Sequence, residues 1–575
     1  MSEGLAGLPK AGNVKPAPRG LSARGVLDLI QHTADGFGAL FDEFSNLPWI
    51  VIPAFTLIYL AATLKIASAK LLWDDEFFTL YISRDVHGIL GALATGADQH
   101  PPSFYYLTHL ITNILGTNHI TFRLPAVVGY WLMCVCLYFI VGRLLSRAWG
   151  AVAMLIPLAS PLYYYASEGR GYGLMVGLSA LAWLIWLRAC EGGNRKVLLP
   201  ALAMCLAGAV SSHYYAILIL LPLGLGELTR WALLKKVDFP MALAFCAPAV
   251  PLLLFLPIIR KASGYSKHFW ARPHWSSLYY FYPSNLGPLQ DIAIVAVIVA
   301  LCYRVFFGHS AGAADPARKQ RPWELASVIG LVAIPLAAMA IAKLVTNGFS
   351  DRYALTGLIG VAVVLCYLMF YISRGVTVIA LIVWTGCLLS FGFNGNVSLS
   401  KGRTVRSDVA GEIHLLESTG KTPIAVAEVT VFHRLSFYAP RELVSRLTYV
   451  ADPKESIKYL GHDTVDRGLL ALRPWFPIHV VPLSIYLART PKFLVYGYVG
   501  EWTWLTYDLS RPGLHTTLVG RRKDRILLSV QNDNANEIPA PPDQGESGSL
   551  FAKLPPTGEP ICDMYMESIH CPAFR

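Results

Sequence analysis

The stretch PWIVIPAFTLIYLAATLKIASAKLLWDDEFFTLY, residues 48–81, sets the architecture of the chain. Its first part, residues 48–68, is an apolar run. About 20 such residues cross the roughly 30 Å hydrocarbon core of a bilayer as a helix. Three carboxylates, Asp74, Asp75 and Glu76, follow closely after this run. Ionisable side chains at a membrane boundary are unfavourable unless they have partners or serve a function. The stretch therefore indicates a membrane helix that ends beside a cluster of acids with a function.

The composition extends this reading to the whole chain. Of the 575 residues, 54% are hydrophobic and 15% are charged, and the mean hydropathy is +0.46. Soluble domains contain about 25% charged residues, so the chain is predicted to be a polytopic α-helical membrane protein. The net charge of +11 is typical of basic cytoplasmic loops. No basic and aromatic module of the kind that binds nucleic acid stands out, so no nucleic-acid partner is expected.

Apolar runs of membrane-spanning length recur along the first two thirds of the chain. They predict about eleven spans, near 48–68, 121–142, 149–167, 172–189, 197–212, 214–232, 240–259, 289–306, 325–345, 353–372 and 375–393. The break around 211–213 is short, which makes that pair the least well defined. The apolar stretch 102–115 is too short for a span and fits an interfacial helix.

The lysines and arginines predict the orientation. With residues 1–46 in the cytoplasm, the basic residues collect in the inner loops, which is the positive-inside pattern. Residues 47–393 then form the membrane domain, with a first outer loop at about 69–120. One outer loop breaks the pattern, because RKASGYSKHFWARPHW carries Arg260, Lys261, Lys267 and Arg272.

The composition changes after about Phe393. Residues 394–575 contain no further span, but they contain short apolar runs such as PIAVAEVTVF, KFLVYGYV and RILLSVQ. These runs are typical of strands, so this part is predicted to be a small extracytoplasmic α/β domain with a loose tail. In that tail, Cys562 and Cys571 are either a disulfide pair or two free thiols. The other cysteines lie in or beside apolar runs and are interpreted as core residues.

On this topology the polar clusters gather on one face of the membrane. The acids of residues 74–76 and DQHPPSFYYLTH (98–109) lie in the first outer loop, and SEGRGY (167–172), SSHYY (211–215) and NGFSDRY (347–353) lie in later outer loops. Each cluster also has a plainer interpretation. The acids could favour a helix start, Arg123 and Arg352 could be interfacial, Glu168 and Arg170 could pair with each other, and His213 could belong to an aromatic belt.

The order of these motifs resembles the GT-C glycosyltransferases. WDDEFF, DQHPPSFYYL, FRLPAVVG, ASEGRGYGL and FSDRYAL follow one another over roughly residues 45–395. The resemblance is greatest to the bacterial group similar to protein O-mannosyltransferases and to the aminoarabinose transferases that act on lipid A. Two departures stand out: Gly169 and Gly171 flank Arg170, and DQHPPSFYY lacks the lysine–proline signature of the lipid A branch.

The resemblance implies an enzyme that transfers a sugar from a polyprenyl phosphate to an acceptor hydroxyl on the outer face, with an acid of the first outer loop as the base. The acidic pair of the family falls on Asp75 and Glu76, with Asp74 as an alternative in a shifted register. A bacterial inner membrane is the location that the resemblance implies. The acceptor is a lipid, a glycan or a protein, and membrane lipids surround the enzyme.

The chemistry agrees with these residue types. A sugar phosphate already has a good leaving group, so an inverting displacement needs one carboxylate as base. A second acid could tune it or hold a divalent cation, Mg or Mn, at Asp75 and Glu76. No cofactor is otherwise expected, and no His/Cys set with metal-ligand spacing indicates zinc. The residues expected to bind donor, leaving phosphate or acceptor are His100, Arg123, Glu168, Arg170, Tyr172, His213, Lys267, Arg272, Arg352 and Tyr353.

Two other classes of function stay open at this point. A transporter or flippase for lipid-linked sugars should carry charged groups near the middle of the membrane, in broken helices. The acids here lie at the boundary instead, which favours the enzyme. A membrane-anchored binding or scaffold protein would use residues 394–575 as its working part.

Overall fold

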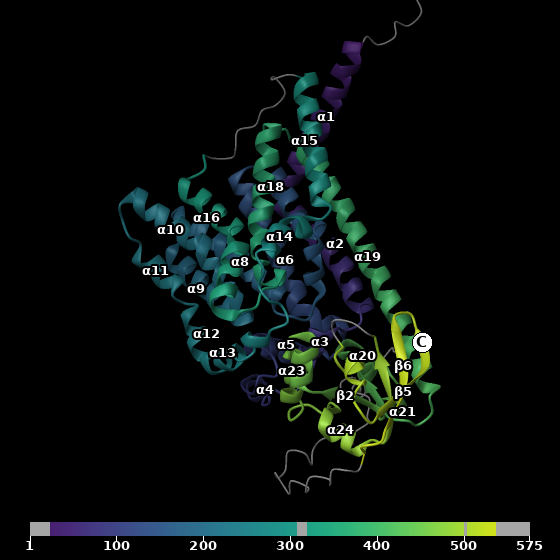
Figure 1. Ribbon diagram of the computed structural model, residues 1–575. Helices are drawn as coiled ribbons and strands as arrows, with labels where there is room; N and C mark the ends of the chain where they lie inside the picture. The colour runs from purple at the N-terminus through teal and green to yellow at the C-terminus, as the bar shows by residue number, and fades with distance from the viewer. Residues whose placement is uncertain (1–22, 308–318, 499–502, 536–575) are drawn as a thin grey trace, which may run out of the picture.

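The computed structural model describes residues 23–307, 319–498 and 503–535 (Figure 1). Within this part of the chain, seven helices are long and apolar enough to cross a membrane. These are α2 (Pro48–Ala69), α6 (His119–Leu144), α8 (Tyr172–Cys190), α9 (Arg195–Ser212), η2 with α10 (Tyr214–Leu234), α15 (Leu289–Phe307) and α19 (Thr377–Glu417). The chain is therefore an integral membrane protein.

The remaining predicted spans are broken or short helices. Two helix pairs bend by 67° and 50° at short breaks, Phe239–Leu254 with Leu256–His268 and Pro322–Val332 with Ile334–Thr346. Two shorter apolar helices are α7 (Arg147–Ala159) and α18 (Gly357–Ser373). Each of the eleven predicted segments thus contains helix. By length and composition the described residues hold seven spans, or nine when each bent pair is one span, so the count of eleven stays a prediction.

The bent pairs and the connections contain several short elements. These are α11 (Phe239–Phe245), α12 (Ala249–Leu254), α13 (Leu256–Ser263), η3 (Ser266–His268), α14 (Ser276–Leu286), α16 (Pro322–Val332), α17 (Ile334–Ile341), η4 (Ala342–Thr346), η1 (Pro161–Ser167) and η5 (Asp351–Ala354). Before the first span, α1 (Ala23–Ser45) is an amphipathic helix that packs against α19.

Helices α6 and α8 pack closely against each other. A Cβ atom on Gly177 would lie 2.1 Å from the Gly129 carbonyl oxygen, and one on Gly173 would lie 2.3 Å from the Ala126 oxygen. Only glycine lets two helix backbones approach this closely. The contact brings the start of α6, with Arg123, beside the loop that precedes α8.

Residues 70–118, between α2 and α6, hold three short helices: α3 (Asp74–Ile82), α4 (Ile89–Thr95) and α5 (Pro102–Leu115). In Figure 1 they lie below the membrane helices and to the left of the C-terminal sheet. The stretch 102–115 forms one helix with a half-buried apolar face, as its composition predicts. The end of the bundle that carries these helices and the sheet is called the domain side below.

The C-terminal part contains a six-stranded sheet in the order β3-β2-β1-β4-β6-β5. The pairs β1–β2, β2–β3 and β1–β4 are parallel, and β6 pairs antiparallel with β4 and β5. The strands are β1 (Ile424–Val426), β2 (Leu447–Ala451), β3 (Val480–Pro482), β4 (Lys492–Gly497), β5 (Leu514–Arg522) and β6 (Arg525–Asn532). The helices are α20 (Val429–Tyr438), α21 (Arg441–Val444), α22 (Pro453–Leu460), α23 (Thr464–Leu472), α24 (Leu483–Arg489) and α25 (Leu505–Asp508).

The predicted α/β character of this part is confirmed, with two differences in detail. Only the first half of PIAVAEVTVF is a strand, because Val429 already begins α20, whose buried side chains continue to Tyr438. Helix α19 also runs without a break through residue 393, where the composition changes, and ends at Glu417. The bilayer-length part of this helix thus continues directly into the sheet domain. Cys562 and Cys571 lie outside the described residues.

The sheet domain and the helices of residues 70–118 share one core. Tyr81 of α3 stacks on Phe476 with ring centroids 4.2 Å apart, and Phe77 stacks on His433 at 5.1 Å. The Tyr81 hydroxyl also lies 3.2 Å from Nδ1 of His433. Because apolar burial of this kind fixes neighbouring elements rigidly, α3 has a defined position between the membrane helices and the sheet.

Candidate functional site

A cavity of about 440 Å³ lies between the helices of residues 70–118, the loops of the membrane domain and the sheet domain. It is called the cleft below. The membrane domain contributes acids, guanidinium groups and aromatic rings to its wall. These residues are Trp73, Asp74, Asp75, Phe78, Asp98, His100, Arg170, Trp270, Arg352 and Tyr353. The sheet domain contributes the facing wall, which includes Glu428, Thr430, Tyr449, His462, Asp466 and Trp504.

The three acids of α3 point in different directions. They occupy the first turn of the helix, directly after Trp73 in extended conformation. Consecutive helix residues lie about 100° apart around the axis, so three neighbours cannot share one face. Asp75 lines the cleft and keeps 25% of its side chain exposed, whereas Glu76 is fully buried. The fold thereby separates three chemically similar groups.

Asp75 is held by Arg352. Oδ2 of Asp75 accepts a hydrogen bond from Nη1 of Arg352, and the two groups form an ion pair. The backbone oxygen of Asp75 accepts a second bond from Nη1 of Arg170 at 3.0 Å. These contacts hold Asp75 in a fixed position at an open cavity, which is the arrangement that a general base requires.

Glu76 instead forms a closed ion pair inside the protein. Arg123 donates from Nε to Oε1 at 2.7 Å and from Nη2 to Oε2 at 2.6 Å, and the Gly169 amide donates to Oε1 at 2.7 Å. Burial would raise the pKa of Glu76, but the Arg123 charge and these hydrogen bonds lower it to about 2. The remaining Arg123 donors bond the carbonyl oxygens of Ala67, Lys70 and Leu71. Arg123 is thus fully engaged within the protein at 0% exposure.

Asp74 contacts the sheet domain. Its Oδ2 accepts a hydrogen bond of 2.7 Å from the Thr430 hydroxyl, and its Oδ1 is buried without a hydrogen-bond partner among the described residues. Burial is the main cause that raises the pKa of Asp74 to about 7. Asp74 therefore connects α3 to α20 and is only in part a carboxylate at neutral pH.

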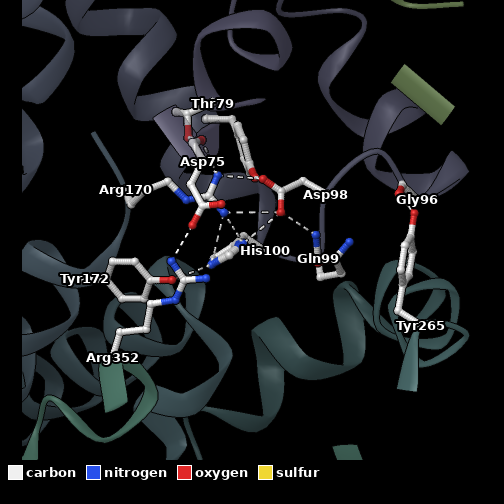
Figure 2. A network of polar contacts seen from close by, with 11 residues as sticks. Asp75, Thr79, Gly96, Asp98, Gln99, His100, Arg170, Tyr172, Tyr265 and Arg352 are labelled. Carbon is white, nitrogen blue, oxygen red and sulfur yellow. Dashed lines mark hydrogen bonds and ion pairs between the residues drawn. The ribbon is translucent and has the colours of Figure 1, made fainter. Parts of the chain in front are cut away.

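A second polar network lies beside Asp75 and centres on Asp98 (Figure 2). Arg170 donates to both Asp98 oxygens, at 2.6 and 3.3 Å, and the Tyr105 hydroxyl donates to Oδ2 at 2.7 Å. Nδ1 of His100 lies 3.0 Å from Asp98 and 2.6 Å from Nη2 of Arg170. Although burial opposes the charged form, Arg170 and His100 hold the pKa of Asp98 well below its usual range.

Arg352 lies among four aromatic rings. Its guanidinium carbon is 5.6 Å from the ring centroids of Tyr172 and Trp270, and 6.0 Å from those of Trp73 and Tyr353. Its Nε is buried and has no hydrogen-bond partner within the described residues. A guanidinium enclosed by ring faces is stabilised as a cation and held in orientation.

An aromatic row continues from His100 to a second, mostly apolar cavity of about 380 Å³. His213 lies 5.0 Å from the rings of His100 and of Tyr172, and Tyr215 stacks on Tyr353 at 4.6 Å. The apolar cavity shares four residues with the cleft: Gln99, His100, Phe269 and Tyr353. Its other wall residues come from membrane helices and include Leu252, Ile259, Ile341 and Val345. The cleft is therefore next to a space suited to an apolar chain.

Lys267, Arg272 and Glu168 lie apart from this arrangement. Lys267 is exposed and lines neither the cleft nor the apolar cavity, and Arg272 donates to the Gly461 carbonyl oxygen at 3.1 Å. Glu168 is fully buried, and both carboxylate oxygens lack a hydrogen-bond partner in the described residues. Burial raises the pKa of Glu168 to about 7. Glu168 and Arg170 do not pair with each other, because Arg170 is bound to Asp98.

The acids do not fit a shared divalent cation. Asp75 is paired with Arg352, and both Glu76 oxygens are occupied by Arg123. A bound cation needs several oxygen ligands that converge on one point. In the described part of the chain no group of three or more His, Cys, Asp or Glu residues has that arrangement.

Sequence reasoning missed several residues of the site. Asp98 organises Arg170 and His100, although it stands in the same DQHPP motif. Trp270 belongs to the segment RKASGYSKHFWARPHW, which the sequence distinguishes only by its basic residues. The facing wall from the sheet domain, with Thr430, carries no local signal, because only the tertiary fold brings it to α3.

Comparisons with known proteins place this geometry in context. Two crystal structures of ArnT from Cupriavidus metallidurans, one in the apo state and one bound to undecaprenyl phosphate, align with 86% of this chain and 99% of theirs. The identity is 16% and the TM-score 0.47 in both cases, so this likeness is too distant to assign a function. No curated protein matches the chain. Residues 99–259 match the family model described as dolichyl-phosphate-mannose-protein mannosyltransferase, and over this segment the resemblance to the GT-C glycosyltransferases is confirmed.

Proposed function

We propose that the chain is a membrane glycosyltransferase that transfers a sugar from a polyprenyl phosphate to an acceptor hydroxyl. One observation carries the proposal: Asp74 and Asp75 both line the cleft, but of the three acids on α3 Asp75 is the one that lines it and is held there by the guanidinium of Arg352. Asp74 and Glu76 are bound to other parts of the protein. The match of residues 99–259 to the mannosyltransferase model supports the same class of reaction.

In the proposed reaction the acceptor hydroxyl oxygen attacks the anomeric carbon, and the bond from that carbon to the phosphate oxygen breaks. Asp75 takes the hydroxyl proton, and the polyprenyl phosphate leaves with the bonding electron pair. A single displacement of this kind inverts the anomeric configuration. The base must lie within hydrogen-bond reach of the attacking hydroxyl, which an acid at the wall of an open cavity permits.

The leaving phosphate gains negative charge, which nearby cations stabilise. Arg352 is the guanidinium nearest to Asp75, and its aromatic surroundings keep it in place. Arg170 lies beside it but is bound to Asp98. We assign the leaving phosphate to Arg352 and the orientation of Asp75 and His100 to Arg170. Lys267 and Arg272 have no part in this assignment.

The apolar cavity next to His100 suits the polyprenyl chain of the donor. Its wall is mostly apolar, and its polar residues include Gln99 and His100 at the edge that it shares with the cleft. A lipid-linked sugar placed across this edge would have its chain among the membrane helices and its sugar in the cleft. The acceptor would then enter the cleft on the side of the sheet domain.

The proposed topology has the N-terminus in the cytoplasm and the domain side on the outer face of a bacterial inner membrane. A protease-accessibility measurement on spheroplasts and on inverted vesicles tests it. Cleavage of the sheet domain in spheroplasts supports the topology, and cleavage only in inverted vesicles contradicts it.

The reaction itself is tested with purified protein reconstituted into lipid vesicles, a mixture of radiolabelled polyprenyl-phosphate sugars and an envelope extract as acceptor. Protein-dependent transfer of label to a product with inverted anomeric configuration supports the proposal. Label that moves across the membrane without a new glycosidic bond would instead support a transporter. Absence of both results with every donor contradicts the proposed reaction.

A further inference from the structure

A third cavity of about 360 Å³ lies on the domain side, where the end of α2, η1, the middle of α19 and Arg434 of α20 meet. We call it the basic cavity. Three cations, Lys70, Lys401 and Arg434, belong to its wall, and no Asp or Glu residue does. Hydroxyl and amide groups from Ser160, Tyr164, Ser167, Asn394 and Ser398 also line it. Cavities of this size are typical of small-ligand sites.

Lys70 is the most unusual of these groups. Its Nζ atom is buried and has no hydrogen-bond partner among the described residues. It lies 3.6 Å from the centroid of the Tyr164 ring, which stabilises an ammonium only in part. A buried ammonium that makes no hydrogen bond destabilises the protein, because it has lost its hydrogen bonds to water and gained no others. An acceptor that enters the cavity would remove this destabilisation.

The protein's own carboxylates do not supply that acceptor. Of the nearby carboxylates, Glu76 favours the charged form of Lys70 most. Arg123 and the Gly169 amide, however, occupy both of its oxygens. Glu168 also acts on Lys70 through its charge, yet neither of its oxygens makes a hydrogen bond in the described structure. Arg123 and Arg434 oppose the Lys70 charge. Burial, as the largest cause, lowers the pKa of Lys70 to about 8.

The walls of the basic cavity are fixed by direct contacts. A Cβ atom on Gly402 would lie 3.2 Å from the Ala69 carbonyl oxygen, so α19 passes close to the end of α2. The Asn394 amide donates to the Leu158 carbonyl oxygen at 3.2 Å, and Nε of Arg434 donates to the Leu72 oxygen at 3.1 Å. Four separate segments are thereby held around one space, which makes it a preformed site.

We propose that the basic cavity binds a phosphate-bearing headgroup, with Lys70, Lys401 and Arg434 as its cationic partners. Two lysines and a fixed guanidinium, with hydroxyl groups between them, match the oxygens of a phosphate. The site lies where the membrane helices end, so the phosphate is that of a membrane lipid.

The basic cavity is separate from the cleft but adjoins it. Trp73 lines both spaces, and the acids of α3 follow Trp73 directly. The apolar cavity joins the cleft at a different edge, through His100 and Tyr353. A lipid phosphate in the basic cavity would therefore not occupy the space that we assign to the donor. The inference goes beyond the proposed transfer reaction and does not depend on it.

Binding is tested on the full chain in a neutral detergent, with the thermal midpoint of unfolding as the readout. Three probes are compared: dioctanoyl phosphatidic acid, dioctanoyl phosphatidylcholine and inorganic phosphate. A ligand that binds the folded state raises the midpoint in a concentration-dependent way. We expect a saturable rise with phosphatidic acid and none with phosphatidylcholine. Because the readout is binding and not sugar transfer, failure of the proposed reaction leaves this test unaffected.

The variants are Lys70→Gln and Lys401→Gln, with Lys65→Gln as the matched control. Lys65 stands on α2, which Lys70 caps at its C-terminal end, and Lys65 is exposed and does not line the cavity. Each cavity variant should lower the affinity for phosphatidic acid roughly tenfold or more, as the loss of a hydrogen bond to a charged group does. Lys70→Arg should restore binding, and Lys65→Gln should change nothing. If Lys70→Gln does not fold, Lys401→Gln decides, because Lys401 is exposed.

Each outcome of these measurements is decisive. A rise with phosphatidic acid alone that both cavity variants weaken supports a lipid phosphate as the ligand. An equal rise with inorganic phosphate, lost in the same variants, supports the phosphate site and assigns it to a free anion. An equal rise with phosphatidylcholine, no rise with any probe, or a rise that neither variant changes overturns the proposal.

Discussion

Asp75 on α3 and Arg352 on η5 form an ion pair between segments 277 residues apart in sequence. The pair connects the first loop region of the membrane domain to the loop before α18, at the wall of the cleft. It gives the base of the proposed reaction a fixed position. It also places the cation for the leaving phosphate next to that base. Motifs that are far apart along the chain are thus brought together in one compact site.

Replacement of Arg352 by Lys should reduce sugar transfer strongly. Lysine keeps the charge but cannot reproduce the planar contacts with the rings of Tyr172 and Trp270. We expect a loss of about 10²–10³-fold in kcat, which is the range for removal of one charge-stabilising donor. Steady-state transfer rates measure it. Arg403→Lys, at an exposed position on α19, is the control, and an equal loss in both variants would contradict the role of Arg352.

The Glu76–Arg123 pair should determine stability more than catalysis. The pKa of Glu76 in the folded state, about 2, is below its unfolded value, so its contribution to the free energy of unfolding is present above about pH 4.5 and lost as the pH falls toward 2. Glu76→Gln should lower this free energy by about 3 kcal/mol at pH 6, because Arg123 loses its buried partner.

Thermal unfolding at pH 6 and at pH 3 checks this prediction. The difference between wild type and Glu76→Gln should shrink at the lower pH, where the wild-type carboxylate also begins to lose its charge. Glu442→Gln, at an exposed position, should match wild type at both values. A difference that stays constant between the two pH values would show that the pair does not contribute in this way.

Asp74 should have the opposite pH dependence. Burial raises its pKa to about 7, so the carboxyl group is stable in the folded state when protonated and destabilises the fold as the pH rises from about 4 through 7. Asp74→Asn keeps an acceptor for the Thr430 hydroxyl and removes the charge. At pH 8 we expect the variant to be more stable than wild type by about 2–4 kcal/mol. Unfolding midpoints at pH 5 and pH 8 measure it, with exposed Asp524→Asn as the control.

The Tyr105 hydroxyl should stabilise the folded protein through its hydrogen bond to Asp98. It donates a 2.7 Å hydrogen bond to a buried carboxylate, and Tyr105→Phe leaves that carboxylate with one donor fewer. The free energy of unfolding should fall by about 1.5–3 kcal/mol, the range for a hydrogen bond to a charged group. Tyr106→Phe on the same helix is the control, because no hydrogen bond to its hydroxyl is found in the described structure. Equal effects of the two variants in a urea titration would contradict the role of Asp98.

Much of the helical architecture follows from the sequence alone. Each predicted apolar segment contains helix, because bilayer thickness and apolar length are directly linked. The meeting of Asp75, Asp98, Arg170 and Arg352 on one side follows from the alternation of loops along a polytopic chain. The sequence could not decide which partner each acid takes, since the three occupy one helical turn and the neighbouring elements decide their contacts.

The sheet domain's part in the site could not be predicted for a similar reason. Thr430 and Tyr449 lie in ordinary apolar stretches, and only the shared core of Tyr81 and Phe476 brings their wall against α3. The roles of Lys267 and Arg272 were inferred from charge alone, and charge does not specify which way a loop faces. Glu76 is a candidate acid through the family resemblance, and the sequence could not show that its partner is Arg123, 47 residues away.

The most direct test of the central claim is sugar transfer by wild type, Asp75→Asn and Asp74→Asn under the same donor and acceptor conditions. Asparagine keeps the shape of each side chain and removes its capacity to take a proton. We predict that Asp75→Asn abolishes transfer while its unfolding midpoint stays close to wild type, and that Asp74→Asn retains transfer. Equal transfer by wild type and Asp75→Asn would contradict the assignment of Asp75 as the base.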